Sequence, residues 1–201
     1  RHFLDSAQVI DFIDKNCKTL VDLGSGAGFP GLVLAIILKD RKIPLKIKLI
    51  EKSPKKTKFL RRVISELNLN VVVLSQNVLE QRITFMEDVF VTRAFKPLKI
   101  ILELIHNKAK NWKKIFVFLG KTGQNELLQA SKNWDIKYKQ RMSVTNSDSI
   151  VIELNTLKKR LSEAVGFEVN EKETKKPLKD SMLDLEYQTC ADEAAALKEI
   201  E

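Results

Sequence analysis

Four of the seven glycines of this 201-residue chain fall within eight positions, in the stretch GSGAGFPG at residues 24–31. The stretch follows an apolar segment, 19–23, that is typical of a buried strand, and it leads into an apolar helix expected to reach Leu38. Glycines between a strand and a helix let the backbone turn tightly and approach a ligand closely. The stretch therefore predicts a ligand-binding loop, which we call the glycine loop, in an α/β fold.

The rest of the chain alternates strand-like and helix-like segments, which predicts a mostly parallel sheet with helices on both faces. Two further strand-like segments, 136–142 and 149–154, predict a terminal antiparallel hairpin and a seven-stranded sheet. The other expected strands are 19–23, 45–50, 70–74, 89–92 and 115–119, and later helices are expected over 97–109 and 124–132.

Two helices carry start signals. Asp5 and Ser6 are expected to cap a helix that continues to about Lys15. Ser53 and Pro54 are an N-cap and a first helical residue. The helix after Pro54 is expected to turn these apolar residues inward: Phe59, Leu60, Val63, Ile64 and Leu67.

Charge divides the chain into two parts. Residues 1–161 hold 30 basic and 15 acidic side chains, whereas residues 162–201 hold 5 and 11. We therefore expect one folded domain over residues 1–160 and an acidic C-terminal extension of unknown role over 161–201, with a short helix near 192–200. The basic excess of the domain favours a polyanionic partner.

The cysteine spacing and the hydropathy of the sequence indicate the cellular compartment of the chain. Cys17 and Cys190 lie far apart, without the spacing of a metal site, which fits a reducing cytoplasm. No apolar run approaches the roughly 20 residues of a membrane span, and no secretory signal is visible. We expect a cytoplasmic monomer that binds neither a membrane nor a metal.

Two nucleoside ligands compete for the glycine loop, because residues 26–31 also satisfy the dinucleotide pattern GxGxxG. Asp22, just before the loop, would accept hydrogen bonds near the amino acid end of S-adenosylmethionine and would repel a pyrophosphate. Pro30 removes an N–H that a pyrophosphate site would use. Glu51 follows the second strand and is placed to accept from ribose hydroxyls, which both ligands carry. The sequence favours S-adenosylmethionine over NAD.

Four segments together resemble the RsmG (GidB) family: RHFLDS at 1–6, VDLGSGAGFPG at 21–31, EKSPKKTKFLRR at 51–62 and TRAF at 92–95. The resemblance runs to about Leu157 and implies a Rossmann-like, class I S-adenosylmethionine-dependent methyltransferase. Such enzymes methylate N7 of a guanosine in 16S ribosomal RNA, and the family's usual target is guanosine 527. The helical segment that precedes RHFLDS in the family is expected to be missing here.

The resemblance also implies site residues. The methyl-donor site would include Gly24 and Phe29, with Gly26 and Gly28 completing the loop. It would also include the dipeptide Leu79-Glu80, in which Glu80 accepts from the adenine amino group or is only a surface residue.

Arg93, at the end of the fourth expected strand, is the predicted catalytic residue and also belongs to the donor site. A guanidinium can pair with an RNA phosphate, stack on a base or donate to guanine O6. Guanine N7 carries a lone pair and no proton, so we expect no general base and no catalytic Cys or His. Proximity should supply most of the catalysis.

RNA contacts are predicted on the basic helix that starts at Pro54, where Lys55, Lys58 and Arg62 share a face. We expect Arg1, His2 and Lys96 to join them, and the partner to be 16S ribosomal RNA or the 30S subunit. Further lysines that favour RNA are Lys108, Lys110, Lys113 and Lys114. Two alternatives stay open: a class I methyltransferase acting on another substrate, and a catalytically inactive module that binds RNA or a small ligand.

Overall fold

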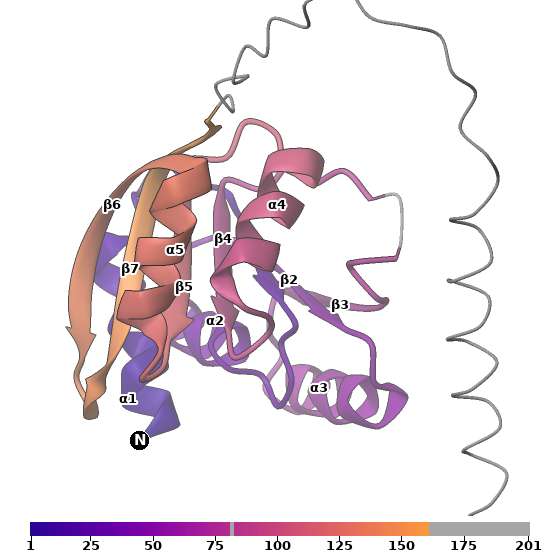
Figure 1. Cartoon of the computed structure of the whole chain (residues 1–201). Coiled ribbons are helices and arrows are strands. Elements are labelled where there is room, and N and C mark those ends of the chain that lie inside the picture. Colours follow the sequence, from indigo (N-terminus) through magenta and orange to yellow (C-terminus); the bar gives the residue numbers. More distant parts are fainter. Residues whose placement is uncertain (81–82, 161–201) are drawn as a thin grey trace, which may run out of the picture. The chain divides into compact units, whose positions relative to one another are not determined.

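One sheet of seven strands, in the order β3-β2-β1-β4-β5-β7-β6, organises the chain (Figure 1). The computed structural model describes residues 1–80 and 83–160, and the expected extension over 161–201 lies outside them. The first five strands run parallel, and the last two form an antiparallel hairpin that joins the sheet at β5. The strands are β1 Thr19–Leu23, β2 Lys46–Glu51, β3 Val71–Ser75, β4 Val89–Arg93, β5 Lys114–Leu119, β6 Trp134–Ser143 and β7 Asn146–Lys159. The predicted sheet and its terminal hairpin are confirmed.

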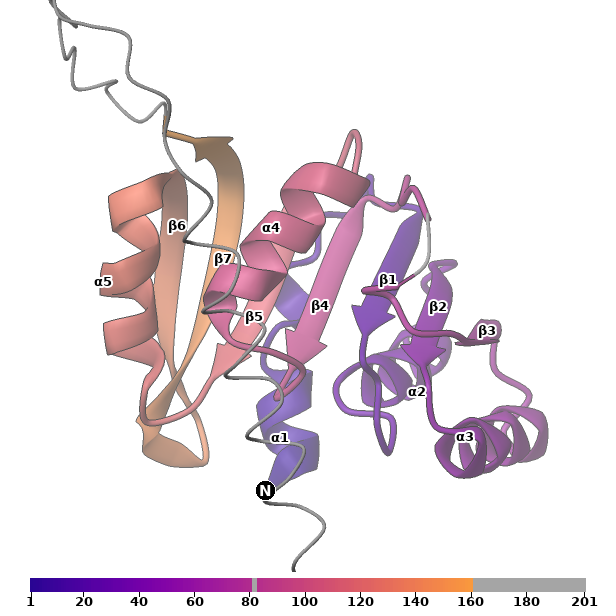
Figure 2. The ribbon, with the colours of Figure 1, turned by 45° about the vertical axis from the view of Figure 1, so that its right-hand side comes forward.

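Helices cover both faces of this sheet, as its buried parallel strands require. Figure 2 shows α4 and α5 on one face, with α2 and α3 on the other. The helices are α1 His2–Ala7, α2 Gly31–Asp40, α3 Pro54–Glu66, α4 Leu98–Lys108 and α5 Gly123–Asn133, with a 3₁₀ turn at Ile10–Phe12. Within residues 1–80 and 83–160, none of these helices combines the length and apolarity needed to cross a membrane.

The N-terminal helix differs from the prediction. It covers His2–Ala7, and only the short 3₁₀ turn follows it, so the helix expected from Asp5 to Lys15 is wrong in its bounds. Ser6 lies inside the helix and donates to the carbonyl of His2 at 2.7 Å. Asp5 is also inside and lies 3.1 Å from Arg93. Because their side chains have these partners, neither residue caps the helix.

Helix α3 begins as predicted but turns a narrower face inward. Ser53 accepts from the backbone N–H of Lys56, and Pro54 is the first helical residue. Thr57 and Leu60, three residues apart, are buried against the sheet. Phe59 is instead 49% exposed, because it lies beside this stripe. Leu67 is 43% exposed and is the C-cap, beyond the last residue of the helix. Their expected inward orientation is wrong.

Asp88, which precedes β4, fastens the start of that strand to the start of β1. Its Oδ2 accepts from the backbone N–H groups of Lys18 and Thr19 at 2.7 and 3.2 Å. The ammonium of Lys113 lies 3.0 Å from its Oδ1. Partial burial raises the pKa of Asp88, but these hydrogen bonds outweigh burial and leave it below its usual value.

Replacing Asp88 with Ala should lower the free energy of unfolding by roughly 1–3 kcal/mol at pH 7, because two N–H groups lose their acceptor. Asp148→Ala is the matched control, since Asp148 forms only an exposed pair with Lys121 at 3.6 Å; it should cost less than about 0.5 kcal/mol. Urea denaturation measures both. The Asp88 contribution should shrink as the pH falls below about 4, since a lowered pKa stabilises the fold only while the group is ionised. Equal losses in the two variants would contradict the fastening role.

Candidate functional site

A cleft of about 500 Å³ opens at the carboxyl ends of the parallel strands. The glycine loop forms one wall, and the residues that follow β2, β3 and β4 form the others. Ligands bind at this edge in open parallel sheets. The predicted site residues that line it are His2, Gly24, Gly26, Phe29, Glu51, Leu79, Arg93 and Lys96.

The glycine loop is tied to the neighbouring strand and to the segment after β4. The N–H groups of Gly24 and Ser25 both donate to the carbonyl of Ile50, at 3.0 and 2.9 Å. Gly24 has a φ of +74°, and a Cβ there would lie 2.3 Å from the ring of Phe95. Only glycine allows the loop to pack this closely on Phe95.

Glu51 is the acidic group of the cleft, and it is 7% exposed at the end of β2. Its Oε2 accepts from the N–H of Gly26 at 2.9 Å, and its Oε1 accepts from the N–H of Ser53 at 2.8 Å. A carboxylate can accept about four hydrogen bonds. The remaining acceptor positions suit the adjacent hydroxyls of a ribose.

Asp22 lies behind the glycine loop rather than on the cleft wall. It is fully buried, its Oδ2 accepts from the N–H of Gly31 at 2.9 Å, and its Oδ1 has no hydrogen-bond partner. Burial raises the pKa of Asp22 to about 7, against the opposing hydrogen bond from Gly31. Gly28 is also behind the wall, where a Cβ would lie 2.7 Å from that of Leu32. Asp22 and Gly28 therefore support the glycine loop on the side that faces away from the cleft.

The loop after β3 closes the other end of the cleft with Leu79, which the resemblance implies, and with Gln76, which no sequence motif marks. Gln76 lines the cleft, and its Oε1 is buried without a hydrogen-bond partner. Glu80 is exposed and accepts from the amide of Asn77, and it is not on the cleft wall. The signal for Gln76 is its position: it directly follows β3, at the same edge as Glu51.

Arg93 ends β4 and lines the cleft with a side chain that is 19% exposed. Its Nη2 lies 3.1 Å from Oδ2 of Asp5 and 2.9 Å from Nδ1 of His2. Asp5 also accepts from the hydroxyl of Ser143. The Nη1 of Arg93 is buried and has no hydrogen-bond partner. The N-terminal helix and the β6–β7 hairpin thus hold a guanidinium that keeps one amino group unused.

The family profile described as GidB, rRNA small subunit methyltransferase G, matches residues 1–153. The chain belongs to the GidB family. A protein named Ribosomal RNA small subunit methyltransferase G from Pelagibacter ubique (strain HTCC1062) is 39% identical over 160 residues, 80% of this chain and 75% of that protein. One of the same name from Dinoroseobacter shibae is 32% identical over 154 residues, 77% and 78% of the two chains.

Solved structures agree on the fold of this GidB chain. M. jannaschii TYW2 in complex with AdoMet has a TM-score of 0.59 at 16% identity, over 80% of this chain and 77% of that one. M. capricolum TrmK in complex with S-adenosyl-homocysteine has a TM-score of 0.57 at 19% identity, over 75% and 66%. The predicted class I methyltransferase fold is confirmed.

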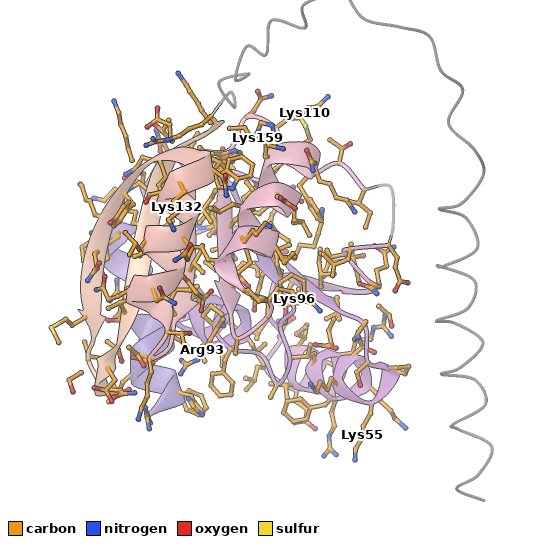
Figure 3. All side chains as sticks on the ribbon, in the orientation of Figure 1. Lys55, Arg93, Lys96, Lys110, Lys132 and Lys159 are labelled. Atoms are coloured by element: carbon orange, nitrogen blue, oxygen red, sulfur yellow. The ribbon has the colours of Figure 1, made fainter. Side chains whose placement is uncertain are left out.

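Basic side chains lie at both ends of the sheet in the part of this GidB chain that the structure describes. Those of α3, with Lys55 and Lys58 exposed, lie at the cleft end, and Lys52, Lys56 and Lys96 line the cleft itself. Lys110 and Lys159 lie at the opposite end of the sheet from Lys55 (Figure 3).

Several of the lysines and arginines expected to favour RNA have partners within the domain. Arg62 pairs with Glu66 at 2.7 Å, Lys113 with Asp88, and Lys114 with Glu153 at 3.3 Å. Lys108 donates to the carbonyl of Val78 at 2.7 Å and so supports the loop after β3. These partners give Lys108, Lys113 and Lys114 structural roles.

Asp22→Asn should change how stability depends on pH in this GidB chain. The pKa of Asp22 is about 7 in the fold but about 3.9 in an unfolded chain, so its protonated form stabilises the fold below pH 4. That stabilisation is lost as the pH rises through 7. Asn cannot titrate and still offers an oxygen to Gly31. The wild-type free energy of unfolding, relative to Asp22→Asn, should therefore fall by roughly 2–4 kcal/mol from pH 4 to pH 8 in urea denaturation. A difference that does not change with pH would refute the raised pKa.

Proposed function

We propose that this chain transfers a methyl group from S-adenosylmethionine to N7 of a guanosine in 16S ribosomal RNA, with guanosine 527 as the position to test first. The observation that carries the proposal is the cleft at the carboxyl edge, where the carboxylate of Glu51 and the guanidinium of Arg93 line one cavity. It lies in a chain of the rRNA small subunit methyltransferase G family. The proposal includes a monomer that works in the cytoplasm, where ribosomal subunits assemble.

The residues of the cleft fit the methyl donor. Glu51 presents a fixed carboxylate to the two ribose hydroxyls, because the N–H groups of Gly26 and Ser53 set its orientation. The unpartnered Oε1 of Gln76 can accept from the adenine amino group, beside Leu79. The amino acid end of the donor would then contact the backbone at Gly24 and the ring of Phe29, which also line the cleft. When bound, the donor supplies an electrophilic methyl group on a positively charged sulfur.

The acceptor atom, guanine N7, has to be positioned in line with the methyl group, and it does not have to lose a proton. Guanine N7 already has a lone pair in the plane of the ring, so no residue has to remove a proton before attack. His2 is the imidazole of the described cleft wall, and its Nδ1 lies 2.9 Å from Arg93 rather than beside a nucleophile. Arg93 can hold a phosphate or guanine O6 with its unpartnered Nη1. Alignment of the reactants can contribute roughly 7–11 kcal/mol to catalysis.

RNA would approach across the cations at the cleft end. Lys55 and Lys58 of α3 are exposed, Lys96 lines the cleft, and Arg1 is exposed beside it at the start of α1. Each phosphate contact would steepen the salt dependence of binding. Arg62 is the weaker candidate of the α3 set because Glu66 already neutralises it.

Glu51→Gln should weaken binding of S-adenosylhomocysteine about tenfold or more, because the amide offers fewer acceptor positions to the ribose. Glu103→Gln is the matched control: Glu103 lies on α4, outside the cleft wall, and its substitution should change affinity less than about twofold. Isothermal titration calorimetry measures both, and melting temperatures show whether each variant folds. Unchanged affinity in Glu51→Gln would contradict the assignment of Glu51 to the ribose.

The function itself is tested with 30S subunits, and with 16S ribosomal RNA, from cells that lack the modification. Incubation with labelled methyl donor should place one 7-methylguanosine in the RNA, mapped by mass spectrometry of nuclease fragments. Arg93→Ala should lower the rate at least tenfold while leaving S-adenosylhomocysteine affinity within about threefold.

Arg41→Ala is the matched control for Arg93→Ala, since Arg41 forms its ion pair with Asp11 at the exposed far end of α2. It should keep full activity. Donor binding with no methylated guanosine would identify a binding module instead, and full activity of Arg93→Ala would remove Arg93 from the mechanism.

A further inference from the structure

A second hollow, of about 340 Å³, adjoins the donor cleft. The two cavities share Ala94, Phe95 and Lys96, the segment that directly follows β4. The shared segment is fixed in place, because Phe95 packs against Gly24 and Ala94 adopts a φ of +48°. A ligand in the second hollow would therefore lie next to a ligand in the first, with a short segment between them.

The walls of this hollow suit a flat base. Phe95 and Phe118 supply aromatic surface, and Gly120 leaves open space where a Cβ would stand. Glu126, on α5, is the acidic residue of the lining, and Lys96 stands at the border with the donor cleft. Ligand pockets commonly combine such an apolar lining with a few fixed polar groups.

The carboxylate of Glu126 is held in position but is not saturated. Its Oε2 accepts from the backbone N–H of Leu98 at 2.7 Å, and its Oε1 accepts from the hydroxyl of Thr122 at 2.8 Å. Since a carboxylate can accept about four hydrogen bonds, two positions remain.

Asp5, which lines a smaller third hollow of about 190 Å³, is less available. Its oxygens already receive Arg93 and Ser143. The larger hollow therefore holds the carboxylate that is better placed to recognise a ligand.

We infer that the second hollow binds the acceptor base and that Glu126 selects guanine by accepting from its N1–H and its 2-amino group; this inference rests on the proposed function. Guanine carries those two donors on the edge of the ring opposite to N7. With that edge on Glu126, N7 turns away from α5 and toward the border with the donor cleft. Adenine would present the lone pair of its N1 to the same carboxylate and would be repelled. Glu126 is thus a specificity-determining residue.

The test compares guanosine with inosine, which lacks only the 2-amino group, at the methylated position of ligated 16S ribosomal RNA in reconstituted 30S subunits. Wild-type protein should methylate guanosine roughly tenfold or more faster than inosine, as kcat/KM, because a carboxylate oxygen loses its donor. In Glu126→Gln, which keeps an oxygen for Leu98, the rate on guanosine should fall and the guanosine-to-inosine ratio should approach one. Glu103→Gln, on the neighbouring α4 and outside both cavities, should keep the wild-type ratio.

Distinct results separate the two proposals. If Glu126 only supports the start of α4, both substrates slow equally in Glu126→Gln and the ratio stays at its wild-type value, which overturns the inference. Equal use of guanosine and inosine by the wild-type protein also overturns it, whether or not the variant folds. The absence of 7-methylguanosine from wild-type reactions on guanosine would instead overturn the proposed function.

Discussion

The carboxyl end of β2 is the part of the molecule on which the site depends. There, the carbonyl of Ile50 accepts from Gly24 and Ser25, and the carboxylate of the next residue, Glu51, accepts from Gly26. These three hydrogen bonds fix successive N–H groups of the glycine loop on the neighbouring strand. Glu51 also accepts from Ser53, which caps α3. The segment 50–53 therefore fixes the position of the glycine loop, the orientation of the Glu51 carboxylate and the start of the basic helix α3. A displacement of one of these three would disturb the hydrogen bonds of the others.

The N-terminal helix α1 supports the site on the side of β4, at the carboxyl ends of the parallel strands. Asp5 reaches Arg93 at the end of β4 and Ser143 at the end of β6, so α1 joins two strands that do not pair with each other. A second contact reinforces this one, since the guanidinium of Arg141 lies 3.5 Å from the ring centroid of Phe12. The RHFLDS segment thus acts through tertiary contacts rather than as a capping signal. It orients the guanidinium of Arg93, which borders both the donor cleft and the smaller hollow beside it.

Local patterns sufficed to predict the strands, the glycine loop and the cap at Ser53, because each depends on neighbours within a few residues. The features that local patterns do not reveal involve long-range partners. Nothing near Asp22 shows that its carboxylate turns under the loop to Gly31 instead of toward the cleft. Phe59 fits a helical stripe in sequence, yet the sheet covers only the narrower face that contains Leu60. In the sequence, Lys108 resembles a surface cation, but in the fold its ammonium donates a hydrogen bond to the Val78 carbonyl in the loop after β3. Gln76 was missed because its chemistry is ordinary and only its place at the strand edge marks it.

The way the site is held accounts for the kind of catalysis it can perform. The proposed reaction at guanine N7 needs no proton acceptor. Two carboxylates at this edge are engaged in holding structure, since Glu51 accepts from two N–H groups and Asp5 receives Arg93 and Ser143. What such a site can offer is fixed geometry, and the contact of Gly24 with Phe95 carries that geometry from the donor loop to the segment after β4. That segment is the wall shared with the second hollow. Donor and acceptor would then be positioned by one continuous set of contacts. Because the rate gained from proximity is steeply sensitive to small displacements, a side chain at residue 24 that displaced Phe95 would lower the rate as well as strain the fold.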